Sequence, residues 1–283
     1  MRAPFSVHEP EPSRETPLVV EIPHAGLDVP PALALTVLAP ARAIARDADL
    51  YVDALYEGAT EEGATLITAN VSRYVVDLNR SEADVDSESV TGARSAPKAP
   101  RGLIWRLSTD GDACIPGPLA AREVAARLDG VYRPYHAAVA RAIEHKRERF
   151  GFAIVLAAHS MPGSGRSAHG DAGATRADVV PGTQGRTTAE QGIIDAVESH
   201  ARKAGYSLRH DDPYRGGFTT RHWGRPSEGV HAIQVEIARR LYMDEGTLVP
   251  RNGAFDTTRS WCRELVARLG QQVPTRGRAR HAG

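Results

Sequence analysis

The most restrictive feature of this sequence is an apolar run that leads directly into a histidine. Residues 152–158 read FAIVLAA, His159 and Ser160 follow, and Pro162 and Gly163 prevent the same structure from continuing. An uninterrupted apolar run of this length, bounded by Pro and Gly, predicts a strand buried on both faces of a parallel sheet. His159 would then lie at the carboxyl end of the strand, where open α/β sheets bind their ligands.

Two other apolar runs deliver an ionisable side chain in the same way. Residues 18–22 (LVVEI) end at Pro23 and His24, and residues 231–237 (HAIQVEI) carry Glu236 near their end. A further strand is predicted at 64–69, and an extended stretch at 74–80. We predict two helices, or one bent helix, over 119–150, with the break or bend at Pro134. Another helix should begin after a capping box at 188–191, and a last one should cover 256–269. Strands that alternate with helices predict an α/β fold with a mostly parallel sheet.

The rest of the chain reads as tails and loops. We predict a mobile tail at 1–16, a single catalytic domain at 17–270 and a mobile basic tail at 271–283. Long loops are expected at 81–118 and 163–186, where periodicity disappears. Asp47 or Asp49 could cap the amino end of a helix that follows.

Composition excludes several classes of function. The 283 residues contain 35 Lys plus Arg and 35 Asp plus Glu, so no net field attracts nucleic acid or an anionic membrane. The sequence contains no run of about 18 apolar residues, so it predicts no transmembrane helix. Cys114 and Cys262 lie far apart and form no CxxC motif, which is typical of reduced thiols in the cytoplasm.

His24, His159 and Glu236 are predicted to meet at one edge of the sheet. Two imidazoles and one carboxylate form a catalytic type of zinc site, in which a fourth position stays open. Glu236 suits a general base that takes and returns a proton. For the carboxylate ligand the sequence leaves Asp28, Asp47, Asp49 and Asp53 open, and such ligands also suit iron, cobalt or manganese. The alternative is that both histidines are merely hydrogen-bonded in a core.

Three arginines could bind a substrate carboxylate. Arg73, Arg80 and Arg221 stand in predicted loops beside Asn79 and Gly217. Guanidinium groups bind carboxylates through two parallel hydrogen bonds, although surface ion pairs would explain any one of them. The glycine-rich segment 163–168 follows a proline and precedes no helical pattern, so it does not predict a dinucleotide site.

Several longer strings resemble the N-formylglutamate amidohydrolase (deformylase) family. In that family's order they are PHAG at 23–26, SRYVVDLNR at 72–80, HSMP at 159–162, PYRGGFTTR at 213–221, QVEI at 234–237 and LYMDE at 241–245. The resemblance covers roughly residues 18–265.

The resemblance implies a three-layer α/β/α domain similar to zinc carboxypeptidases and to the phosphorylase/hydrolase-like fold. It implies zinc-dependent hydrolysis of N-formyl-L-glutamate to L-glutamate and formate, a last step of histidine breakdown. His24 and His159 would be metal ligands, with Asp49 as the third ligand, or else Asp47, and Glu236 would be the base. Asp77 could orient His159. The residues expected to face the substrate are Arg73, Asn79, Arg80, Tyr214, Gly217 and Arg221.

Two alternatives remain open at this stage. The same scaffold could hydrolyse another N-acyl amino acid or a peptide-like amide, or it could bind carboxylates without metal or chemistry. In each case the partner is a small molecule, not a nucleic acid or a membrane. The sequence predicts no oligomeric state.

Overall fold

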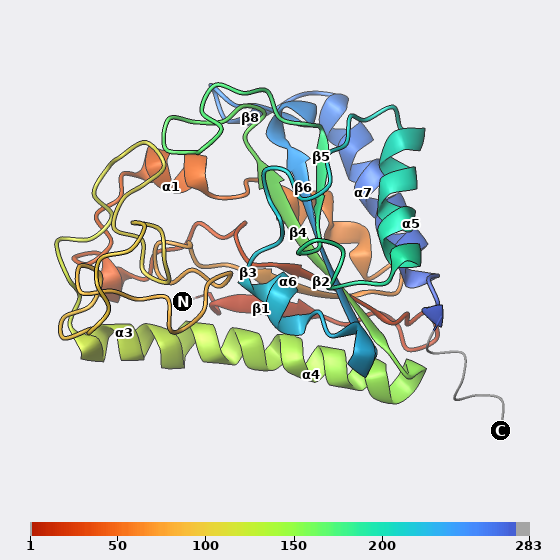
Figure 1. Ribbon diagram of the computed structural model, residues 1–283, viewed down its shortest axis with the longest axis horizontal. Helices are drawn as coiled ribbons and strands as arrows, with labels where there is room; N and C mark the ends of the chain where they lie inside the picture. The colour runs from red at the N-terminus through yellow and green to blue at the C-terminus, as the bar shows by residue number, and fades with distance from the viewer. Residues whose placement is uncertain (1, 276–283) are drawn as a thin grey trace.

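A six-stranded sheet with four parallel central strands forms the middle of the molecule (Figure 1). The computed structural model describes residues 2–275. Strand order is β1-β3-β2-β4-β6-β5, and the edge strands β1 and β5 run antiparallel to their neighbours. The strands are β1 (Phe5–His8), β2 (Leu18–Ile22), β3 (Thr65–Ala69), β4 (Ala153–Met161), β5 (Val179–Gly182) and β6 (Val230–Ala238), with a small hairpin of β7 (Met243–Asp244) and β8 (Val249–Pro250).

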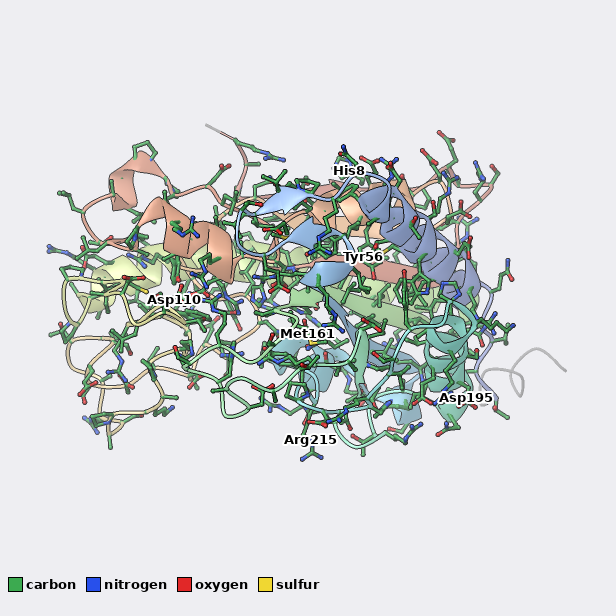
Figure 2. The ribbon with its side chains drawn as sticks, turned by 90° about the horizontal axis from the view of Figure 1, so that it is seen from above. His8, Tyr56, Asp110, Met161, Asp195 and Arg215 are labelled. Atoms are coloured by element: carbon green, nitrogen blue, oxygen red, sulfur yellow. The ribbon has the colours of Figure 1, made fainter. Side chains whose placement is uncertain are left out.

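Helices cover both faces of the sheet, which confirms the predicted three-layer α/β/α architecture (Figure 1). Helices α4 and α6 pack on one face, and α2, α5 and α7 pack on the other. The helices are α1 (Ala41–Asp47), α2 (Val52–Leu55), α3 (Ala121–Arg127), α4 (Arg133–Phe150), α5 (Gln191–Lys203), α6 (Phe218–Trp223) and α7 (Ala254–Gly270). Figure 2 shows Tyr56 and Met161 inside these layers, whereas Asp195 and Arg215 lie at the periphery.

The central strands are buried on both faces, as their apolar sequences predict. All nine residues of β4 and all nine of β6 are buried. Along β2, Val19 packs with the α4 side of the core, whereas Leu18 and Val20 pack with the α7 side. This alternation explains why the strand sequences contain so few polar positions.

Three of the predicted loop and tail assignments are wrong. The predicted mobile tail at 1–16 is wrong over its described residues 2–16, because β1 pairs with β3 from Phe5↔Ala69 to His8↔Leu66. The stretch 163–186 contains strand β5, and its four residues VVPG were too short to stand out from the loop. Residues 74–80 form turns instead of an extended stretch. The loop prediction for 81–118 is confirmed, since no named helix or strand lies there.

The helix predictions are confirmed in position, but two predicted caps are wrong. Asp47 is the last residue of α1, and α2 begins only after Tyr51, so neither Asp47 nor Asp49 caps it. The capping box before α5 does not form, because Glu190 makes no side-chain cap and Thr188 Oγ1 donates to the Ala232 carbonyl instead. A π-helical turn at Leu128–Tyr132 joins α3 to α4 beside Pro134.

Domain and membrane predictions have separate outcomes. The single catalytic domain at 17–270 stays a prediction, and most of the predicted basic tail at 271–283 lies outside the described residues. Among residues 2–275, no helix combines the length and the apolar character that crossing a membrane requires.

The amino-terminal segment is anchored by a buried ion pair. Glu15 lies 2.6 Å from Nζ of Lys146 on α4, and the Lys146 side chain is fully buried. Burial alone would raise the pKa of Glu15, but the hydrogen bond and charge of Lys146 hold it below its ordinary value of 4.5. A carboxylate with a lowered pKa stabilises the fold above its unfolded pKa, and this contribution disappears as the pH falls through the folded pKa.

We therefore expect Glu15→Gln to lower the free energy of unfolding by about 3 kcal/mol at pH 7, since it leaves a buried ammonium without its carboxylate. The difference from wild type should shrink as the pH falls below 4.5. Urea denaturation at a series of pH values measures both effects. Glu144→Gln removes an exposed ion pair on the same helix and serves as the control. An equal loss in both variants would contradict the buried-pair explanation.

Candidate active site

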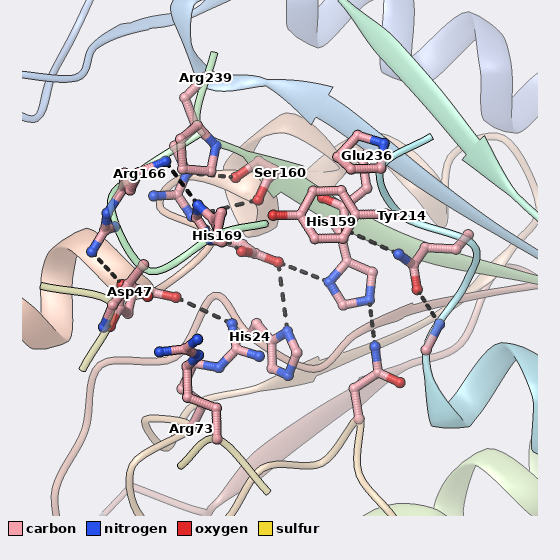
Figure 3. A pocket seen from close by; sticks show the side chains of 18 of the residues that line it. His24, Asp47, Arg73, His159, Ser160, Arg166, His169, Tyr214, Glu236 and Arg239 are labelled. Carbon is pink, nitrogen blue, oxygen red and sulfur yellow. Dashed lines mark hydrogen bonds and ion pairs between the residues drawn. The ribbon is translucent and has the colours of Figure 1, made fainter. Parts of the chain in front are cut away.

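The carboxyl ends of β2, β4 and β6 open into a cavity of about 410 Å³ (Figure 3). The parallel register places His159 on β4 directly beside Glu236 on β6. His24 follows β2, which pairs with β4 on its other side. All three side chains line this cavity, so the predicted convergence of the three strand ends is confirmed.

His24, Asp49 and His159 form a buried cluster whose candidate ligand atoms all lie within 4.8 Å of one another. Asp49 Oδ2 lies 2.8 Å from His159 Nδ1 and 3.7 Å from His24 Nδ1. Burial alone would raise the pKa of Asp49, but hydrogen bonds from His159 and His24 hold it well below its ordinary value. The carboxylate is therefore ionised and faces both imidazoles.

Of the four aspartates that the sequence left open, only Asp49 belongs to this cluster within the described residues. Asp47 accepts hydrogen bonds from the Tyr74 hydroxyl at 2.5 Å and from the Thr109 amide at 2.8 Å, and it pairs with Arg166 at 2.7 Å. Asp49 reaches the centre because its amide donates to the His24 carbonyl, which ties the segment after α1 to the end of β2. The Asp47 side chain instead binds groups of the surrounding turns and loops.

Each imidazole is held through its second ring nitrogen. His24 Nε2 lies 2.8 Å from Asp77 Oδ1, and His159 Nε2 lies 3.3 Å from the side-chain nitrogen Nδ2 of Asn79. The expectation that Asp77 orients His159 is therefore wrong: Asp77 orients His24, and Asn79 lies against His159. Both outer partners come from the turns at 74–80.

Asp77 is fully buried and holds several groups at once. Its Oδ2 accepts hydrogen bonds from Arg73 Nη2 at 2.8 Å and from the Trp105 indole at 2.9 Å. Its Oδ1 accepts one from the backbone N–H of Asn79. Burial alone would raise the pKa of Asp77, but the charges of Arg73 and His24 hold it well below its ordinary value. The Arg73 guanidinium also lies over the Trp105 ring, 4.4 Å from its centroid. A single carboxylate therefore fixes His24, Arg73 and Trp105.

Glu236 is positioned by its neighbours on the same edge. Gln234 Nε2 donates to Glu236 Oε1 at 2.9 Å, and Gln234 Oε1 accepts the Gly217 amide at 2.8 Å. Burial raises the pKa of Glu236 to about 7, the His159 charge opposes this shift, and the Asp49 charge adds to it. A carboxyl with a pKa near 7 can both accept and return a proton at neutral pH.

Most residues expected to face the substrate line the cavity. Asn79, Arg80, Tyr214 and Gly217 do so, and Arg73 does so while bound to Asp77. At Gly217 a Cβ would overlap the Asn79 side chain, so only glycine allows Asn79 to lie there. Arg221 differs from the expectation, because it is exposed and lines a neighbouring depression with Arg80 and Lys98.

Sequence reasoning missed several residues of the cavity. Arg239 is buried, donates to Asp49 Oδ1 at 3.3 Å and contacts Ser160 Oγ at 3.2 Å. Its place just after β6 was a usable signal, since that is the edge where His159 and Glu236 lie. Arg101, Trp105 and Arg166 come from the irregular loops 81–118 and 163–178, where no periodic pattern indicated a direction.

A family model described as N-formylglutamate amidohydrolase matches residues 16–243, a range that contains every residue of the cluster and Glu236. The chain belongs to the N-formylglutamate amidohydrolase family. The resemblance inferred from the sequence strings is thus confirmed.

Relatives in the family cover most of the chain. An N-formylglutamate deformylase of Pseudomonas aeruginosa is 33% identical over 257 residues, which are 89% of this chain and 92% of the relative. An N-formylglutamate deformylase of Pseudomonas putida is 32% identical over 232 residues, covering 81% and 82%. The crystal structure of N-formylglutamate amidohydrolase from Ralstonia eutropha JMP134 matches with a TM-score of 0.85 and 34% identity, over 95% of this chain and 97% of that one.

In this member of the family, Asp77→Asn should lower the free energy of unfolding by about 3 kcal/mol, since it removes the fully buried carboxylate that neutralises partly buried Arg73. Denaturation in the presence of a chelator isolates this effect from any metal binding. Asp84→Asn, in the same loop region but about one third exposed, should change stability by at most about 0.5 kcal/mol. Equal stability of the Asp77 variant and wild type would show that Asp77 does not hold these groups together.

Proposed function

We propose that this protein is a metal-dependent hydrolase that cleaves N-formyl-L-glutamate to L-glutamate and formate. The observation that carries the proposal is the buried cluster of His24, Asp49 and His159, with Glu236 beside it in one cavity. Its relatives named N-formylglutamate deformylase support the choice of substrate. We also propose that the reaction belongs to histidine breakdown in the cytoplasm, which is consistent with two buried, unpaired cysteines.

The residues present fit a divalent metal ion. Two imidazole nitrogens and one ionised carboxylate face one another, and His24 directs its second ring nitrogen at the Asp77 carboxylate, as is usual for metal-ligating histidines. Arg239 binds the other oxygen of Asp49 and leaves Oδ2 directed at the histidines. Three ligands of this type suit zinc with one position open, and zinc is our choice of metal. A metal ion there would polarise the formyl carbonyl and lower the pKa of water.

Glu236 is proposed as the catalytic base. It lies next to His159 in the register of the sheet, and Gln234 fixes one of its oxygens. Ionised Glu236 would take a proton from the attacking water and return it to the leaving amine nitrogen. The Gly217–Gln234–Glu236 hydrogen bonds keep its carboxylate directed into the cavity.

The substrate carboxylate next to the amide is assigned to Asn79 and Arg80. The Asn79 side chain contacts His159 at the centre of the cavity. The Arg80 guanidinium donates to two backbone carbonyls, which are neutral, so its positive charge can bind a substrate carboxylate. Tyr214 and Gly217 close the same wall. We do not assign Arg221 to substrate binding, because it lies outside this cavity.

The first test concerns the metal ligands. Elemental analysis of protein purified without chelator should give one metal ion per wild-type chain. Asp49→Asn should weaken binding at least about 10-fold, and Asp47→Asn should retain the ion. Circular dichroism confirms that both variants are folded. Loss of metal from the Asp47 variant but not from the Asp49 variant would reverse the assignment.

The second test concerns Glu236. Glu236→Gln should lower kcat by about 1000-fold, since the base is lost, and should leave metal content unchanged. In the wild type the base must be ionised, so kcat/KM for N-formyl-L-glutamate should fall as the pH drops below about 7. Formate release measures both. Near-normal turnover by Glu236→Gln would assign the base to another residue.

A further inference from the structure

The cavity has far more cationic than anionic side chains on its wall. Seven arginines and three carboxylates line it. The arginines are Arg46, Arg73, Arg80, Arg101, Arg166, Arg215 and Arg239. Four of them pair with carboxylates of the protein: Arg46 with Asp110, Arg73 with Asp77, Arg166 with Asp47, and Arg239 with Asp49. The remaining three, Arg80, Arg101 and Arg215, have no close carboxylate partner among residues 2–275.

Those three arginines differ in how they are held. Arg215 is exposed and lies at the edge of the molecule (Figure 2). Arg80 has only a loose carboxylate neighbour, Asp84 at 3.9 Å. Arg101 is half-buried and has no carboxylate within 4.0 Å among residues 2–275, and its Nη2 donates to the Ala168 carbonyl at 3.0 Å. Its guanidinium therefore reaches from the 81–118 loop to the 163–178 loop.

Arg80 and Arg101 are fixed beside each other. Arg80 Nε donates to the Arg101 carbonyl at 3.0 Å, and a backbone bridge to Trp105 holds the position of Arg101. Arg80 follows Asn79, which lies against His159 at the centre of the cavity. Arg80 is thus the neighbour of the residue that contacts His159 and donates to its carbonyl, whereas the Arg101 guanidinium contacts the outer loop at Ala168.

We propose that Arg101 determines specificity by binding the second, side-chain carboxylate of the substrate. This inference rests on the proposed function. An N-acyl glutamate carries one carboxylate beside the amide and another two methylene groups farther along. Arg80 takes the first, and Arg101 takes the second. Because neutral side chains cannot make the second ion pair, Arg101 selects acidic N-formyl amino acids over their neutral isosteres.

The test compares N-formyl-L-glutamate with N-formyl-L-glutamine, which has the same shape but a neutral side chain. Arg101→Gln should lower kcat/KM for N-formyl-L-glutamate about 100-fold, mainly through KM, and change that for N-formyl-L-glutamine at most about 3-fold. Glutamine keeps an N–H donor for the Ala168 carbonyl, so the contact between the loops has a substitute. Arg101→Lys, which retains the charge, should recover part of the discrimination.

Arg94→Gln is the matched control, because Arg94 lies in the same loop, is exposed and does not line the cavity. It should leave kcat/KM for both substrates unchanged. Equal losses on both substrates in Arg101→Gln, or no loss on either, would overturn this inference while the proposed function stands. If the metal-loaded wild type cleaves neither substrate, the proposed function fails and the inference fails with it.

Discussion

The parallel pairing of β2, β4 and β6 is the constraint on which the site depends. Parallel strands bring their carboxyl ends to one edge of the sheet, so side chains distant in sequence meet there. The register that places His159 beside Glu236 is enforced along the whole length of both strands, because every residue of β4 and β6 is buried. A slip of one residue would turn each of these side chains to the opposite face.

A second constraint is electrostatic and comes from the turns at 74–80. Asp77 is a fully buried carboxylate, and such a charge is costly unless hydrogen bonds and opposite charges surround it. Here Arg73, Trp105 and His24 surround it. The same hydrogen bonds that offset the cost of burying the Asp77 charge also fix the ring of His24, the position of Trp105 on the cavity wall and the backbone N–H of Asn79. Stability and the geometry of the site therefore depend on the same group.

The strands of the core and the residues they deliver could be predicted from sequence, because apolar runs that end in Pro or Gly have few alternative structures. His24, His159 and Glu236 were found in this way. Asp49 could not be separated from Asp47 by pattern, since the distinction depends on one backbone hydrogen bond to the His24 carbonyl and on the loop contacts of Asp47. Likewise β1 and β5 are short edge strands, whose pairing depends on partners far along the chain. Arg101 and Arg166 lie in loops without periodicity, so only the fold reveals their direction.

The charge of the cavity connects these features to the chemistry. Two guanidinium groups on this wall, those of Arg80 and Arg101, donate to backbone carbonyls and have no tight carboxylate partner. Their positive charge is therefore not compensated by the protein. A divalent cation between His24, Asp49 and His159 would add to this charge. A neutral ligand would leave the imbalance in place, whereas a dianion would neutralise two guanidinium groups at once. The same imbalance raises the local concentration of anions before binding, since a cleft lined by one sign of charge focuses the field into its mouth.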